Sequence, residues 1–185
     1  MRLELIRPRL DVLAGYAAAL KRGWSPDNVR QAAAQEELER IRTDPVLFVA
    51  QLDDPEAKGG PVTLPDGSVV PRLPGFQRWL WDGAFCGKIG FRWQPGTSAL
   101  PPHVLGHIGF AVVPWKRRRG YATRALGLLL REVGDKGLTF VELTTDLDNV
   151  ASQRVIQANG GQLVERFKKP APYGGTEACR FRINL

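Results

Sequence analysis

Cysteine is scarce in this sequence, and long apolar runs are missing. Cys86 and Cys179 are the only cysteines among 185 residues. Two cysteines are too few for a disulfide framework or a zinc site, so we expect reduced thiols in the cytoplasm. No run of about 18 apolar residues is present, which excludes a membrane-spanning helix. The first residues, MRLELIRPRLDV, scatter charges where a secretory signal needs an apolar block, so no such signal is expected.

The charge balance favours anionic partners without identifying them. Lys and Arg total 26 against 19 Asp and Glu, which gives a net charge of +7. Nucleic acid, an acidic membrane and a polyphosphate cofactor are all compatible with this excess. The length and the ordinary composition are typical of one globular domain over 1–185, large enough to bury a core without disulfides.

In the N-terminal half, residue periodicity predicts a strand followed by two helices. LELIRP at 3–8 is typical of a short strand, and apolar residues then recur at helical spacing from Leu10 until Gly23. The second helix should begin after Ser25, a good N-cap with Pro26 at the first helical position, and end at 44–45, an Asp-Pro pair.

A change of composition separates these helices from a β-rich region. Residues 53–75 hold many prolines and glycines, and PDG at 65–67 joins two short β-like runs, so we expect a hairpin insertion or flap. From residue 77, apolar residues alternate across the turn at 82–83, which predicts a β-hairpin over 77–93 with one aromatic face.

The remaining elements complete a mixed α/β sheet. Strands are expected at 106–113, 138–146, 162–167 and 178–185, and helices after Gly120 and after Asn149. The predicted order is strand, two helices, three strands, helix, strand, helix and two strands. No internal repeat or second domain is evident.

Four consecutive basic residues occupy 116–119 in the stretch VVPWKRRRGYA, at a predicted turn from strand to helix. The first N–H groups of a helix have no internal partner, and Gly120 lets a phosphate approach the backbone closely. This arrangement is a cradle for a pyrophosphate. The alternative is a solvated cationic loop. Other phosphate-loop signatures, GxGxxG and GxxxxGK[ST], are absent.

Two motifs carry a family resemblance. RRRGYA at 117–122 matches the [RQ]-x-x-G-x-[GA] signature of the GNAT superfamily of acyl-CoA N-acyltransferases. DNVASQRVIQANGG at 148–161 is similar to the N-x-x-[AS] helix of that family, which ends in a glycine pair. The sequence resembles the family from about 77 to 167, and more weakly before that. The resemblance implies an α/β fold whose mixed, mostly antiparallel sheet is flanked by about four helices.

The resemblance also implies a reaction, in which an acetyl group passes from acetyl-CoA to a primary amine within a ternary complex, without a metal. The pyrophosphate would bind the backbone of 117–122, and the pantetheine arm would pair with the strand 110–113. The N–H of Val112 would polarise the thioester carbonyl. The cofactor-binding residues implied are Phe110, Ala111, Val112, Val113, Arg117, Arg118, Arg119, Gly120, Tyr121, Ala122, Thr123, Asn149 and Ser152.

Direct attack needs an acid for the leaving thiolate and a base for the ammonium proton. Ile156 stands where many family members have a tyrosine acid, so the resemblance points to Ser152 instead. His107 is a candidate base, with a structural histidine as the equal alternative, and Glu142 is the competing carboxylate. His103 and His107 form an H-x-x-x-H pair, but a β run makes a metal site unlikely there.

The acceptor is not identified by the sequence. Trp24 and Tyr173 are candidate acceptor contacts, and a small molecule or a peptide amine is compatible with both. The resemblance leaves a homodimer open and gives no role to a membrane. A non-enzymatic basic module that binds nucleic acid or CoA through 116–124 is the alternative, with nucleic acid the less favoured ligand.

Overall fold

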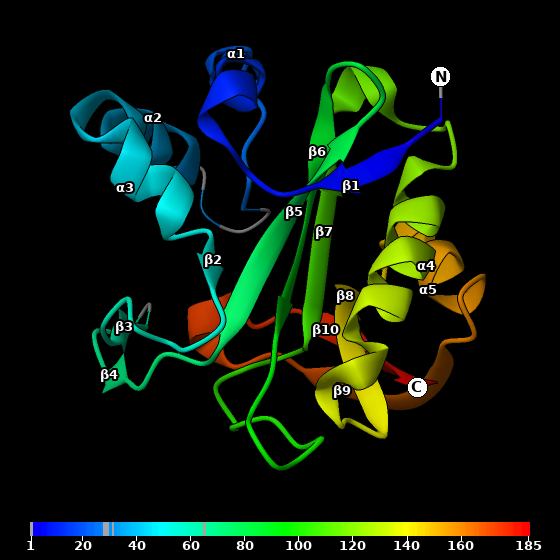
Figure 1. The fold of residues 1–185 in the computed structure, drawn as a ribbon. Coiled ribbons are helices and arrows are strands. Elements are labelled where there is room, and N and C mark those ends of the chain that lie inside the picture. The colour runs from blue at the N-terminus through cyan, green and yellow to red at the C-terminus, as the bar shows by residue number, and fades with distance from the viewer. Residues whose placement is uncertain (1, 28–29, 31, 65) are drawn as a thin grey trace.

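A computed structural model describes residues 2–27, 30, 32–64 and 66–185. Figure 1 shows helices packed around twisted sheets, and the α/β class expected from the sequence is confirmed. The elements are β1 (Glu4–Ile6), α1 (Leu13–Lys21), α2 (Ala33–Thr43), α3 (Pro45–Ala50), β2 (Asp53–Asp54), β3 (Val62–Thr63), β4 (Val69–Val70), β5 (Gly75–Trp81), β6 (Phe85–Arg92), β7 (Ile108–Val112), α4 (Tyr121–Val133), β8 (Phe140–Asp146), α5 (Val150–Gln157), β9 (Gln162–Lys168) and β10 (Glu177–Asn184).

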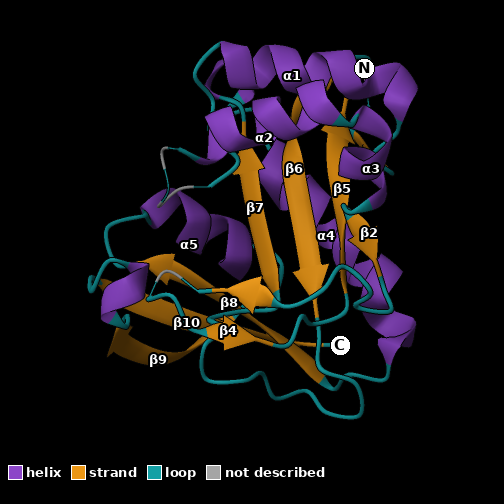
Figure 2. Cartoon of the chain, turned by 90° about the vertical axis from the view of Figure 1, so that its left-hand side faces the viewer, coloured by secondary structure: helices purple, strands orange, loops and turns teal. Residues whose placement is uncertain are grey.

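The strands form two main antiparallel sheets that separate between β7 and β8. One has the order β1-β5-β6-β7, with β2 also on β5, and the other has the order β8-β10-β9. A backbone bond joins them where β7 begins: the His107 N–H donates to the Glu142 carbonyl at 2.7 Å. Figure 2 shows β7 running away from β8 beyond this junction, so that one edge of β7 is left open.

Two apolar cores fill the two faces of the first sheet. Tyr16 of α1 packs with Trp24, Phe48 and Trp79 on one face, and α4 packs on the other. α4 faces the core on its side with Leu126, Leu129 and Val133, which are fully buried. The described residues contain no helix long and apolar enough to cross a membrane.

The β5–β6 hairpin is confirmed, but its single aromatic face is not. Trp79 and Phe85 belong to the α1-side core, whereas Phe91 and Trp93 belong to the α4-side core. The register between β5 and β6 shifts by one residue after Leu80. A shift of this kind is a β-bulge, and it reverses which side chains face each side.

The second helix begins later than predicted. Ser25 caps a turn rather than a helix, since its Oγ donates to the Asp27 carbonyl at 2.8 Å, and α2 begins at Ala33. The predicted start also covers 28, 29 and 31, which lie outside the described residues. Asp44 ends α2 as expected, and its Oδ1 also accepts from the Leu47 N–H at 2.9 Å, capping the additional helix α3.

The flap predicted at 53–75 contains a hairpin of two short strands, β3 and β4. The expected PDG turn is described from Asp66 onward, because Pro65 lies outside the described residues. The Leu64 and Gly67 backbones are joined by a 2.9 Å hydrogen bond across this turn. The hairpin lies below α2 and α3 in Figure 1, and its residues Val62, Thr63 and Val70 form one wall of a cavity described below.

Candidate active site

The open edge of β7 exposes backbone groups to a ligand. His107 and Val113 are hydrogen-bonded to β6. The Arg92 N–H donates to the His107 carbonyl at 2.9 Å, and the Val113 N–H donates to the Cys86 carbonyl at 3.0 Å. Because alternate residues of a strand point their backbone groups to opposite edges, Phe110 and Val112 direct theirs away from β6. No described strand pairs with that edge. An extended chain can therefore bind there as an added strand.

The two candidate bases, His107 and Glu142, lie where the two sheets meet. His107 is 0% exposed, and its Nδ1 accepts the Glu142 N–H at 2.9 Å. Burial lowers its pKa to about 4, despite the nearby Glu142 carboxylate. The Glu142 Oε1 is held by Arg182 at 2.7 Å. Neither residue is among those that line the cavity described below, and their role as base stays a prediction.

After β7 the chain turns into α4 through a loop with two left-handed residues. Arg118 and Gly120 have left-handed φ angles of 59° and 71°, and Gly120 is the N-cap of α4 without any side-chain cap. A positive φ is unusual for an arginine, and strained backbone is common at functional sites. The first helical bond is Arg124 N–H to the Gly120 carbonyl, 3.0 Å. The N–H groups at 121–123 therefore point outward at the positive end of the helix.

Lys116 anchors this loop instead of serving as a free charge. Its Nζ lies 2.8 and 2.9 Å from the two oxygens of Asp82, whose side chain is 8% exposed. The Tyr121 hydroxyl donates to the same carboxylate at 2.6 Å. Burial opposes the Asp82 charge, but these two hydrogen bonds outweigh it and hold its pKa below the usual range. Arg117, Arg118 and Arg119 are exposed.

Asn159, just beyond the end of α5, lies beside the first turn of α4. Asn149 caps α5 by accepting the Ser152 N–H at 3.1 Å, and the Ser152 side chain is half-buried. The Asn159 amide donates to the Thr123 carbonyl at 3.1 Å, which fixes α5 against the first turn of α4. Figure 1 shows both helices on the same side of β7. The two motif segments are thus held together by a contact between the end of α5 and the start of α4.

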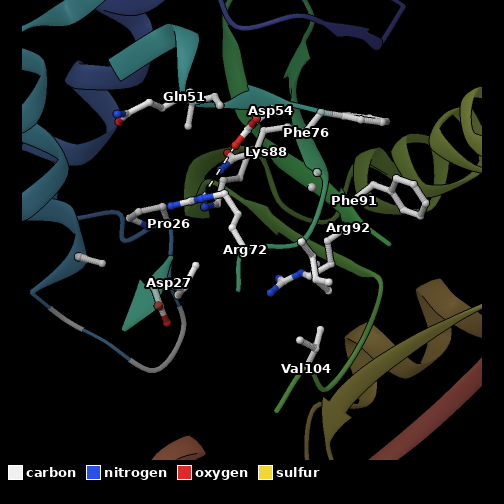
Figure 3. A pocket seen from close by; sticks show the side chains of 18 of the residues that line it. Pro26, Asp27, Gln51, Asp54, Arg72, Phe76, Lys88, Phe91, Arg92 and Val104 are labelled. Atoms are coloured by element: carbon white, nitrogen blue, oxygen red, sulfur yellow. Dashed lines mark ion pairs between the residues drawn. The ribbon is translucent and has the colours of Figure 1, made fainter. Parts of the chain in front are cut away.

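A cavity of about 1030 Å³ opens on the other side of β7. Its floor is the face of β5, β6 and β7, and its walls are α2, the β3–β4 flap and the loop that carries Tyr173. Figure 3 shows side chains of both signs around it, among them Asp27, Asp54, Arg72 and Arg92. Since Phe110 and Ala111 line this cavity as well, an acceptor in it and a ligand on the strand edge would meet at β7.

The two predicted acceptor contacts differ in outcome. Tyr173 lines the cavity, and its hydroxyl donates to the His103 carbonyl at 2.7 Å. Trp24 is 4% exposed and packs edge-on against Tyr16 and Phe85 in the α1-side core, and it is not among the residues that line the cavity. Sequence reasoning missed Lys88 and the acidic wall of α2. The sequence did contain an indication, because Lys88 and Arg92 are charged residues in a central strand that is otherwise apolar.

A metal site is not apparent in the part of the chain that the structure describes. No group of three or more His, Cys, Asp or Glu is arranged to hold an ion among those residues. His103 lines the cavity while His107 lies in the core, so the two do not form a ligand pair.

Solved acetyltransferases share this architecture. The chain aligns over 99% of its length with 92% of the microcin C7 self-immunity acetyltransferase MccE in complex with acetyl-CoA and AMP, at 15% identity and a TM-score of 0.64. It aligns over 99% of its length with 94% of RimL, a ribosomal L7/L12 α-N-protein acetyltransferase in complex with coenzyme A. The identity is 13% and the TM-score is 0.65. The chain also aligns over 99% of its length with 82% of Mycobacterium smegmatis RimJ, at 16% identity and a TM-score of 0.67.

At these identities the likeness concerns the fold, and no curated protein matches the sequence. A family model makes the assignment. The model of the acetyltransferase (GNAT) family matches residues 22–160, well over half of the chain, including β7, the cradle at the start of α4, and α5. The chain therefore belongs to the acetyltransferase (GNAT) family, whose members are acetyl-CoA-dependent N-acetyltransferases.

Proposed function

We propose that this protein transfers an acetyl group from acetyl-CoA to a primary amine by direct attack in a ternary complex. The observation that carries the proposal is the position of β7, which has an open backbone edge on one side and an acceptor cavity on the other. The solved neighbours MccE and RimL were found with acetyl-CoA and with coenzyme A, respectively. RimL acts on a protein α-amine, which supports a peptide terminus as one acceptor class.

In this proposal the pyrophosphate binds the backbone N–H groups of 117–122, and the Thr123 hydroxyl assists. The pantetheine arm pairs with Phe110 and Val112, in the manner of an added strand. Asn149 contacts the arm while it caps α5. The exposed arginines attract the anionic cofactor over longer distances.

The chemistry follows from these positions. The Val112 N–H donates to the oxygen on which negative charge develops when the amine attacks the thioester. Ser152, in the first turn of α5, gives its proton to the leaving thiolate. The base belongs to the cavity, since His107 and Glu142 lie outside it. Glu37 is the carboxylate assigned to this role: it lines the cavity and accepts a hydrogen bond from Tyr16.

The first test is binding. Acetyl-CoA and desulfo-CoA should both raise the unfolding temperature, because a ligand of the native state stabilises it by about 2.7 kcal/mol at 100 times Kd. Desulfo-CoA retains the pyrophosphate but lacks the thiol, so it separates binding from turnover. Differential scanning fluorimetry is the measurement. An unchanged unfolding temperature at millimolar acetyl-CoA contradicts the proposal.

The second test concerns the acid. Ser152→Ala should lower kcat by about 100-fold or more, because general acid catalysis contributes about 10²–10⁴. The Asn149 cap uses the backbone N–H of residue 152, so the variant keeps the cap, and kcat should fall far more than the acetyl-CoA affinity. Steady-state thiol release and calorimetric Kd are measured together. A variant with the kcat of the wild type rejects Ser152 as the acid.

A further inference from the structure

The floor of the acceptor cavity carries two cations without a partner. Lys88 and Arg92 lie four residues apart on β6, so both side chains face the cavity. Neither side chain makes an ion pair or a hydrogen bond with a described residue, whereas other cations of the cavity do. Arg40 donates to Gln51 at 2.7 Å, and Arg72 donates to the Gly60 carbonyl at 2.8 Å. Arg30 is paired with Glu36.

Lys88 and Arg92 hold two positive charges in one cavity without a direct ion pair to a described carboxylate. Burial lowers the pKa of Lys88, and the positive charge of Arg92 lowers it further, against the opposing effects of Glu37 and Asp27. Removing positive charge from water and placing it beside like charge costs free energy that an anionic ligand restores.

The opposite wall has the complementary sign. Asp27, Glu36 and Glu37 line the cavity from α2 and the turn before it. Figure 3 shows Asp27 and Arg92 on different sides of the cavity, with Lys88 and Arg72 between them. A cavity of this kind holds an ammonium group at its acidic wall and an anion at its basic floor. A ligand that carries both an ammonium group and an anion can pair with both walls, whereas a singly charged ligand pairs with one wall only.

We propose that the acceptor is an amine that also carries a carboxylate or a phosphate, and that Lys88 and Arg92 bind this anionic group. The inference rests on the proposed N-acetyltransferase function. Arg92 offers the planar fork that matches either anion, and Lys88 adds a compact charge. Lys88 lies opposite Ala111 in the register. Because strands are about 4.8 Å apart, the anion and the amine should be separated by about 5–10 Å.

Matched dipeptides test this inference. We compare alanyl-aspartate with alanyl-asparagine, and alanyl-phosphoserine with alanyl-serine, all as C-terminal amides so that only one anionic group differs. Thiol release from acetyl-CoA gives kcat/KM. The anionic member of at least one pair should exceed the neutral member by about tenfold, the size expected for a charge-assisted hydrogen bond. The two pairs separate a carboxylate site from a phosphate site.

Two variants locate the effect. Lys88→Met and Arg92→Gln should each lower kcat/KM for the anionic dipeptide by about tenfold and leave the neutral dipeptide within about twofold. Lys168→Met and Arg166→Gln are the matched controls, because these exposed cations lie on β9 in the other sheet. Equal turnover of both members of each pair by the wild type, or equal losses for both members in Lys88→Met and Arg92→Gln, overturns the inference.

A binding measurement covers the case in which no dipeptide is acetylated. With CoA saturating, inorganic phosphate or acetate should raise the unfolding temperature of the wild type and of both β9 controls, but not of Lys88→Met or Arg92→Gln. Absence of any shift that depends on Lys88 and Arg92 overturns the inference. Failure of CoA itself to bind overturns the proposed function instead, so the two failures are distinguishable.

Discussion

Gly120→Glu should abolish acetyl-CoA binding, with Kd raised at least about 100-fold, because like charges placed together cost several kcal/mol. Gly120 is the uncapped N-cap of α4, and a Cβ there meets nothing within 4 Å. The new carboxylate is free to occupy the position of the pyrophosphate and to bind the same N–H groups. Calorimetric titration of acetyl-CoA into the folded variant is the measurement.

Gly137→Glu is the matched control. Gly137 follows α4 with a φ of 71°, equal to that of Gly120, and a Cβ there also meets nothing within 4 Å. The backbone strain of the two variants is therefore the same, about 1–3 kcal/mol, and only the position of the charge differs. An equal loss of affinity in both variants contradicts the cradle. Lys116 is unsuitable as a control, since its removal leaves Asp82 buried with one fewer partner.

The cofactor half of the site could be predicted because it is local in sequence. The strand, the cradle and the start of α4 form one continuous stretch, and the caps at Gly120 and Asn149 depend on residues within a turn of them. Local geometry of this kind follows from residue type, since glycine tolerates a positive φ and asparagine accepts a helical N–H. What sequence reasoning missed here was Lys116, whose partner Asp82 lies on the β5–β6 turn.

The acceptor half could not be predicted because it is assembled from distant segments. Glu37, Arg72, Lys88 and Tyr173 come from a helix, a flap, a strand and a late loop. Their grouping depends on how β6 faces α2, which periodicity does not specify. The same limit applies to the burial of His107, which follows from the junction with β8: nothing near position 107 indicates that contact.

The bulge that divides the predicted aromatic face also leads to the second prediction with a large effect, on stability. Gly87 lies at the β6 bulge with a φ of 152°, a conformation that side chains rarely adopt. A Cβ there would overlap the Ala111 carbonyl oxygen and approach the Val112 Cα to 2.9 Å. The glycine therefore permits β6 and β7 to pair closely where the thioester is proposed to bind. The alternation of apolar residues in the sequence does not indicate such an inserted residue.

Gly87→Ala should lower the free energy of unfolding by about 3–5 kcal/mol, the sum of backbone strain and of overpacking against β7. Urea denaturation followed by tryptophan fluorescence measures it. Gly109→Ala, on the adjacent strand, is the control: its Cβ meets nothing within 4 Å and its φ is not positive, so its stability should change by about 0.5 kcal/mol or less. If both variants lose the same stability, close pairing at Gly87 is not what shapes β7. If only Gly87→Ala is destabilised and its folded fraction also binds acetyl-CoA less tightly, the bulge positions the Val112 edge for the cofactor.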